Sequence, residues 1–160
     1  MEFRGRPLIE HAIAAARRWK PLVVASPEVA AYLAGRGDVA VVRNDEPERG
    51  MSHSLVLAHR FLDRDGAAIV LLGDKPFVSE ALIERICRQT GDADVVYPVR
   101  GVEPGHPVVL SAKARRRIES LPRGDTLRFL RSDPGLVRLA VETTDDGAYF
   151  DVDTPEDFES

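Results

Sequence analysis

Acidic residues in this sequence follow short apolar segments, at positions where a carboxylate can bind a metal ion. Asp74 comes directly after an apolar run that ends in Gly73, and Pro76 fixes the turn that follows. Mg²⁺ takes one or two protein carboxylates together with phosphate oxygens, so a rigidly held carboxylate at a strand end suits it. Aspartate is equally common as the cap of a turn or a helix, and the spacing alone leaves both roles open for Asp74.

A second acidic segment lies near the C-terminus. Asp151 and Asp153 alternate along an extended stretch, so both side chains can point to the same side. Thr154 can cap a helix that Pro155 begins, and Asp153 then needs no role beyond capping. Asp151 follows an apolar pair at a strand end, which favours a ligand role. If Asp74 converges with Asp151 or Asp153, the two carboxylates form a metal site.

Two serines and a histidine are candidates for binding a substrate. Ser52 and Ser54 follow Gly50 at the start of a predicted helix, where free backbone N–H groups can hold a phosphate or a base edge. The alternative is a glycine turn followed by a serine cap. His106, between Gly105 and Pro107, can donate a hydrogen bond to a phosphate or be an ordinary exposed loop histidine.

Short apolar segments without polar alternation, as in strands buried on both faces, alternate with helical patterns along the chain. The predicted strands are residues 22–25, 39–42, 67–72, 94–99, 107–110 and 136–141. The predicted helices are residues 7–16, 27–35, 52–62, one that begins at Ser79, 112–120, 125–131, and a final turn opened by Thr154. This order predicts a single three-layer α/β/α domain over residues 1–160 with a mostly parallel sheet. Ligands of such sheets bind beyond the carboxyl ends of the strands.

Composition excludes several classes of protein. The chain has 160 residues, 44% of them hydrophobic, which is enough for one domain with a sizeable core. A net charge of −4 gives no basic field for nucleic acid or anionic lipid. No apolar run approaches the roughly 20 residues of a membrane span. The single cysteine, Cys87, allows no internal disulfide, so we expect a cytoplasmic protein.

Taken in order, the motifs resemble the molybdopterin-type nucleotidyltransferases, and specifically the molybdenum cofactor cytidylyltransferase branch. The matching segments are residues 5–11, 41–44, 50–55, 72–78, 105–108 and 151–157. The Gly-Met-Ser-x-Ser-Leu and Gly-His-Pro elements favour the cytidylyl-type branch over the guanylyl-type branch. Lys75 stands where relatives more often have glutamine, a departure that leaves Asp74 in place.

The resemblance implies a Rossmann-like fold of the nucleotide-diphospho-sugar transferase type. It implies transfer of a nucleoside monophosphate from CTP, or alternatively GTP, to a phosphorylated acceptor such as molybdopterin, with release of pyrophosphate. Asp74 would hold Mg²⁺, helped by Asp151 or Asp153, to neutralise charge on the triphosphate. The residues implied on the nucleotide or acceptor side are Asn44, Ser52, Ser54 and His106.

Relatives begin with a strand and a glycine-rich loop that cradles the triphosphate, and Met1 falls about where the family resumes after that loop. We therefore expect a central strand and the phosphate loop to be absent from this sequence, which would leave neighbouring strands unpaired. Three interpretations stay open: a start further upstream, a strand from another copy that completes the sheet, or loss of nucleotide transfer. The last would make the protein a non-catalytic binding or assembly module.

Overall fold

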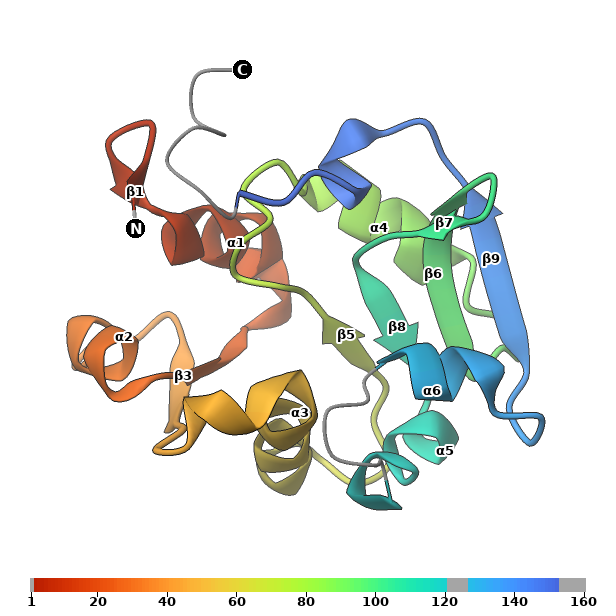
Figure 1. The fold of residues 1–160 in the computed structure, drawn as a ribbon, viewed down its shortest axis with the longest axis horizontal. Coiled ribbons are helices and arrows are strands. Elements are labelled where there is room, and N and C mark those ends of the chain that lie inside the picture. Colours follow the sequence, from red (N-terminus) through yellow and green to blue (C-terminus); the bar gives the residue numbers. More distant parts are fainter. Residues whose placement is uncertain (1, 121–126, 153–160) are drawn as a thin grey trace.

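The computed structural model describes residues 2–120 and 127–152, and its main strands form two separate groups (Figure 1). The strands are β1 (Glu2–Phe3), β2 (Arg6–Pro7), β3 (Leu22–Ala25), β4 (Ala40–Arg43), β5 (Ala68–Val70), β6 (Val95–Arg100), β7 (Glu103–Pro104), β8 (Val108–Leu110) and β9 (Arg138–Glu142). The smaller group is the parallel pair of β3 and β4. In the larger group β8 runs antiparallel to both β5 and β6, and β9 runs parallel to β6. Strands β5, β6 and β9 therefore share one direction.

The helices lie between these strands, as the sequence predicts. They are α1 (Leu8–Ala16), α2 (Pro27–Tyr32), α3 (Gly50–Phe61), α4 (Glu80–Arg88), α5 (Ala112–Arg115) and α6 (Leu127–Ser132). Every predicted strand is present, and so is every predicted helix up to residue 132, with shifted ends. The final turn predicted at Thr154 lies outside the described residues. None of the described helices is long and apolar enough to cross a membrane.

Helices cover both faces of the larger sheet. Neighbouring side chains along a strand point to opposite faces, so Val95 and Val96 of β6 pack against different helices. Val95 packs with Leu55 of α3 and Leu130 of α6, in the core cluster that α5 also joins. Val96 packs on the other face with Ile83 and the rest of the apolar side of α4, and partly buried residues of α1 lie against the same cluster. The result is the predicted three-layer α/β/α arrangement.

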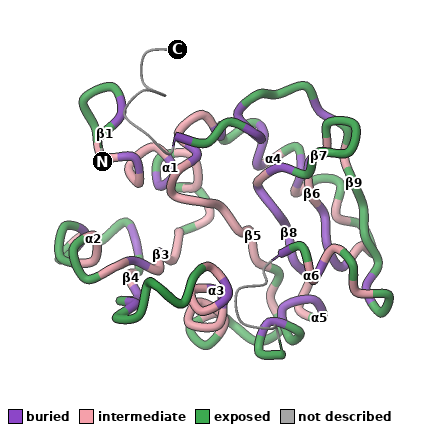
Figure 2. The backbone as a smooth tube through the Cα atoms, in the orientation of Figure 1, coloured by how far each residue is buried: buried purple, intermediate pink, exposed green. Residues whose placement is uncertain are grey.

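The two groups of strands leave a gap between β3 and β5 (Figure 1). In the part of the chain that the structure describes, β3 pairs only with β4, and β5 pairs only with β8. All three residues of β5 are partly exposed, whereas all three residues of β8 are buried (Figure 2). The sequence predicts burial on both faces for the strand around residues 67–72. That prediction is wrong for β5, because one side of the strand borders the gap.

The loop between β5 and α4 packs tightly against the C-terminal segment of the described chain. The backbone N–H of Val152 donates to the carbonyl oxygen of Asp74 at 3.0 Å, and the Val152 side chain is buried. Gly147 lies so close to Phe77 that an added Cβ would sit 2.9 Å from the Phe77 carbonyl carbon. The ring of Phe77 meets that of Phe150 edge-on, with centroids 5.2 Å apart. Segments that are seventy or more residues apart in sequence are therefore fixed to each other.

We predict that Gly147→Ala lowers the free energy of unfolding by about 2 kcal/mol, because the new methyl group collides with the Phe77 backbone rather than with a side chain that can turn away. Urea denaturation followed by circular dichroism measures the change. Gly37→Ala is the matched control, since a Cβ there meets nothing within 4 Å. Equal stability of the two variants would contradict this account of the packing.

Candidate active site

Asp74 lies in the loop that leaves the carboxyl end of β5, as the sequence predicts. The Val152 N–H bonded to its carbonyl oxygen belongs to the residue directly after Asp151. The two acidic segments that the sequence singles out therefore adjoin, with Asp74 and Asp151 at their meeting point. Asp153, the other candidate ligand, lies outside the described residues.

Lys75 follows Asp74 directly in the chain and contacts Asp151, and sequence reasoning gave it too little weight. Its side chain is 5% exposed, and its ammonium forms an ion pair with the Asp151 carboxylate, which stays 46% exposed. The same ammonium donates to the carbonyl oxygen of Tyr149 at 3.2 Å. A buried ammonium needs such partners, because desolvation penalises its charge. The substitution of lysine for the family's glutamine was the one signal in the sequence that could have pointed to this contact.

His106 joins the same group of residues through its backbone. Its N–H donates to the carbonyl oxygen of Ala148 at 2.9 Å, two residues before Phe150. Gly105 makes this approach feasible, since a Cβ there would lie 2.6 Å from the same oxygen. The side chain of His106 is partly buried and its Nδ1 is enclosed without a hydrogen-bond partner among the described residues. The interpretation of His106 as an ordinary exposed loop histidine is therefore wrong.

The electrostatics of the group keep His106 neutral. Burial, followed by the positive charge of Lys75, lowers the pKa of His106 to about 4, although a hydrogen bond with the Val70 backbone acts in the opposite direction. At neutral pH one nitrogen of a neutral imidazole accepts a hydrogen bond and the other donates one. We call Asp74, Lys75, His106 and Asp151 the Asp74 cluster.

Asn44 and Ser54 form a second group, which we call the Asn44 pair. The Asn44 side chain is 2% exposed, and its amide donates to the Ser54 hydroxyl at 3.2 Å. Its carbonyl oxygen accepts the backbone N–H of Glu46 at 2.9 Å. These bonds fix the end of β4 to helix α3. Asn44 is thus held in the structure, and Ser54 is the member of the pair that a ligand can approach.

Ser52 is buried inside the first turn of α3. The helix begins at Gly50, with Arg49 at its N-cap, and no side chain there makes a capping hydrogen bond. The interpretation of this segment as a serine-capped turn is therefore wrong, because the helix starts two residues earlier than the sequence predicts. Ser52 is not brought into contact with the Asp74 cluster by any described interaction.

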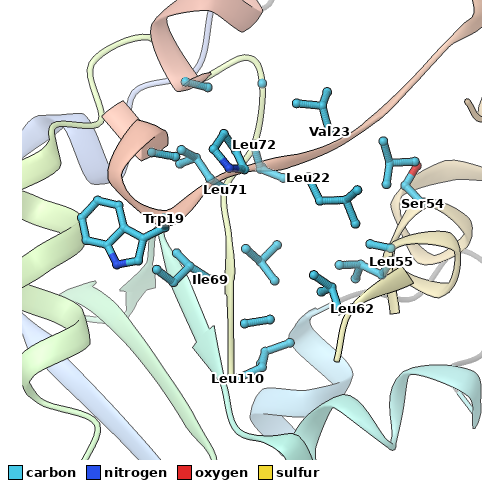
Figure 3. Close-up of a pocket in the computed structure, with 18 of the residues that line it drawn as sticks. Trp19, Leu22, Val23, Ser54, Leu55, Leu62, Ile69, Leu71, Leu72 and Leu110 are labelled. Carbon is cyan, nitrogen blue, oxygen red and sulfur yellow. The ribbon is translucent and has the colours of Figure 1, made fainter. Parts of the chain in front are cut away.

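A cavity of about 560 Å³ separates β3 and α3 from β5 (Figure 3). Its walls are mainly apolar, and Leu22, Leu55 and Ile69 represent the three elements. Two polar side chains that the sequence singles out, Ser54 and Asp74, lie in the same lining. The volume is within the usual range for small-molecule sites, and the cavity also borders the side of β3 and of β5 on which neither strand is paired.

The donor set at the Asp74 cluster fits a hard divalent ion. The described residues contain no group of three or more histidine, cysteine or acidic side chains around one point. Mg²⁺ needs no such cage, because it is commonly bound by one or two carboxylates, with water and substrate phosphates completing its shell. Asp74 and Asp151 provide carboxylate oxygens on adjoining segments, so they are the residues that would hold the ion.

Comparison with known proteins decides the family. The model of the family described as MobA-like NTP transferase domain matches residues 1–138, which is most of the chain. The chain belongs to this family. The members of this family are nucleotidyltransferases, in agreement with the resemblance seen in the motifs. A curated relative, the bifunctional protein GlmU of Ruegeria sp. (strain TM1040), is 32% identical over 108 residues, which cover 63% of this chain and only 24% of that protein.

Solved structures of low sequence identity share the fold. The rv0371c homologue from Mycobacterium sp. strain JC1 has a TM-score of 0.81 at 21% identity, over 95% of this chain and 79% of that chain. Rv0371c of Mycobacterium tuberculosis H37Rv in complex with manganese has a TM-score of 0.76 at 21% identity, over 99% of this chain and 87% of that chain. Molybdopterin-guanine dinucleotide biosynthesis protein A of Archaeoglobus fulgidus has a TM-score of 0.73 at 18% identity, over 99% of this chain and 85% of that chain. These similarities confirm the predicted fold class.

The pKa of His106 predicts a loss of stability in mild acid. In the unfolded chain the pKa of the histidine is near its usual value of about 6.5. Between pH 6.5 and 4 the unfolded chain therefore carries a proton on His106 that the folded chain does not. Stability is fully present above this window and falls as the pH is lowered through it. We expect the contribution of His106 to the free energy of unfolding to fall by about 2 kcal/mol between pH 7 and pH 5.

Urea denaturation of the unaltered protein and of His106→Gln at both pH values isolates this contribution from that of other groups. The difference in unfolding free energy between pH 7 and pH 5 should be smaller in the variant. The assignment would be wrong if both proteins lost the same free energy over this interval.

Proposed function

We propose that this member of the family transfers a nucleoside monophosphate from a nucleoside triphosphate, CTP in preference to GTP, to a phosphorylated acceptor of the pterin type. The observation that carries the proposal is that Asp74, which lines a cavity large enough for a small substrate, adjoins the segment that carries Asp151. The preference for CTP and for an acceptor such as molybdopterin rests on the Gly-Met-Ser-x-Ser-Leu and Gly-His-Pro motifs.

The reaction needs no nucleophile from the protein. An oxygen of the acceptor phosphate attacks the α-phosphorus, a new P–O–P bond forms, and the bond to the β-phosphate breaks so that pyrophosphate leaves. Asp74 and Asp151 would hold Mg²⁺, and the chemistry that the bound ion supplies is neutralisation of the triphosphate charge. A neutral His106 can bind an acceptor group through a hydrogen bond without adding charge to the site. Ser54 can bind from the α3 wall of the cavity.

Asp74→Asn tests the role of the carboxylate, because the amide keeps the shape of the side chain and removes its charge. We expect the rate of pyrophosphate release from CTP and molybdopterin in the presence of Mg²⁺ to fall by roughly 100-fold or more. Asp92→Asn is the matched control, since Asp92 is exposed in the turn after α4 and should change the rate little. Unchanged turnover in Asp74→Asn would remove this residue from the mechanism.

A second candidate function rests on the cavity between β3 and β5. Each of these strands is paired on one side only in the described residues, and apolar side chains from both line the space between them. A strand supplied by a second copy of the chain could pair there, since unpaired strand edges are templates for an added strand. Such a strand would complete the sheet, and a chain that uses its open edges only for this pairing would be an assembly module without nucleotide transfer.

Calorimetry separates the two candidates. If the protein is a nucleotidyltransferase, the 160-residue chain should bind CTP in the presence of Mg²⁺ with a micromolar dissociation constant, and CTP more tightly than GTP. If it is an assembly module, it should bind neither nucleotide, and light scattering should show a dimer. A monomer that binds CTP would exclude the second candidate.

A further inference from the structure

Lys75 is a buried cation that is fixed against Asp151, one of the two carboxylates of the proposed metal site. It follows Asp74 directly in the chain, and its ammonium is ion-paired with Asp151. The ammonium also donates a hydrogen bond to the Tyr149 carbonyl oxygen, and Tyr149 is itself held in place. The backbone N–H of Tyr149 donates to Asp146 at 3.0 Å, and its buried ring lies under the guanidinium of Arg100.

The position of the ammonium limits what Lys75 can do. With a side chain that is 5% exposed, it cannot swing into solvent without breaking both contacts, so it is not a mobile arm that gathers substrate. Asp151, by contrast, remains about half exposed and can still meet a ligand from the solvent side. In the described structure the negative charge of Asp151 is therefore already balanced from within the protein.

We propose that Lys75 balances the charge of Asp151 and so weakens the binding of free divalent metal at Asp74 and Asp151. This inference rests on the proposed function, because that proposal assigns the two carboxylates to the metal. The physical reason is Coulombic: a fixed positive charge next to the site repels a divalent ion and competes for a carboxylate that would otherwise attract it. A glutamine at this position carries no charge and would leave the negative charge of Asp151 unbalanced.

Metal titration of the 160-residue chain tests this inference without a catalytic assay. We expect Lys75→Gln to bind Mn²⁺ about tenfold or more tightly than the unaltered protein, as measured by the electron paramagnetic resonance signal of free Mn²⁺. Lys75→Arg keeps the charge and should bind with nearly unchanged affinity. Adding Asp74→Asn to Lys75→Gln should abolish the gain, which would locate the ion at this site. Equal or weaker binding by Lys75→Gln would overturn the inference.

A second measurement uses the unaltered protein and does not depend on the folding of a variant. The chain has only three lysines, Lys20, Lys75 and Lys113, so the ¹⁵Nζ signals of labelled lysine can be assigned individually. Mg²⁺ should shift the Lys75 signal, while Lys113, paired with Asp94 at 2.9 Å, should serve as an unshifted control. Saturation with Mg²⁺ that leaves the Lys75 signal unmoved would overturn the inference.

The two proposals fail in different ways. If neither the unaltered protein nor Lys75→Gln binds Mn²⁺, the metal site is wrong, and both the proposed function and this inference fall. If Mn²⁺ binds in a manner that depends on Asp74 but not on the residue at position 75, the proposed function stands and only the role of Lys75 is lost.

Discussion

The backbone contact between the loop after β5 and the segment that ends at Val152 is the constraint on which the candidate site depends. One hydrogen bond, from Val152 to Asp74, fixes the register of the two segments. Gly147 lets the Phe77 backbone approach closely, and Gly105 does the same for the Ala148 carbonyl, where any side chain would collide. Because backbone rather than flexible side chains sets these distances, Asp74, Asp151 and His106 are held in one place before any ligand binds.

Charge within the Asp74 cluster is arranged by burial as much as by residue type. Lys75 keeps its positive charge inside the protein through Asp151 and the Tyr149 carbonyl, and that charge helps burial to keep His106 neutral. The cluster thus combines carboxylates, an internal cation and a neutral imidazole.

The gap between β3 and β5 links the fold to function. It divides the sheet and exposes β5, and at the same time it provides the cavity that Ser54 and Asp74 line from opposite walls. The Asn44 pair fixes α3 on one side of this cavity, and Asp74 lines the other. Whatever fills the gap, a small substrate or a strand, contacts the walls that carry the candidate functional residues.

The sequence by itself determined the order of strands and helices, the ends of β3 and the position of Asp74 after β5, because these depend on local apolar patterns and turn residues. It also singled out both acidic segments, but it left open whether they meet. Only the tertiary structure decided that Asp151 adjoins Asp74, that Lys75 pairs with Asp151 and that His106 is enclosed. These are contacts between residues 42 to 78 positions apart, set by the packing of loops against each other, and no local pattern encodes such packing.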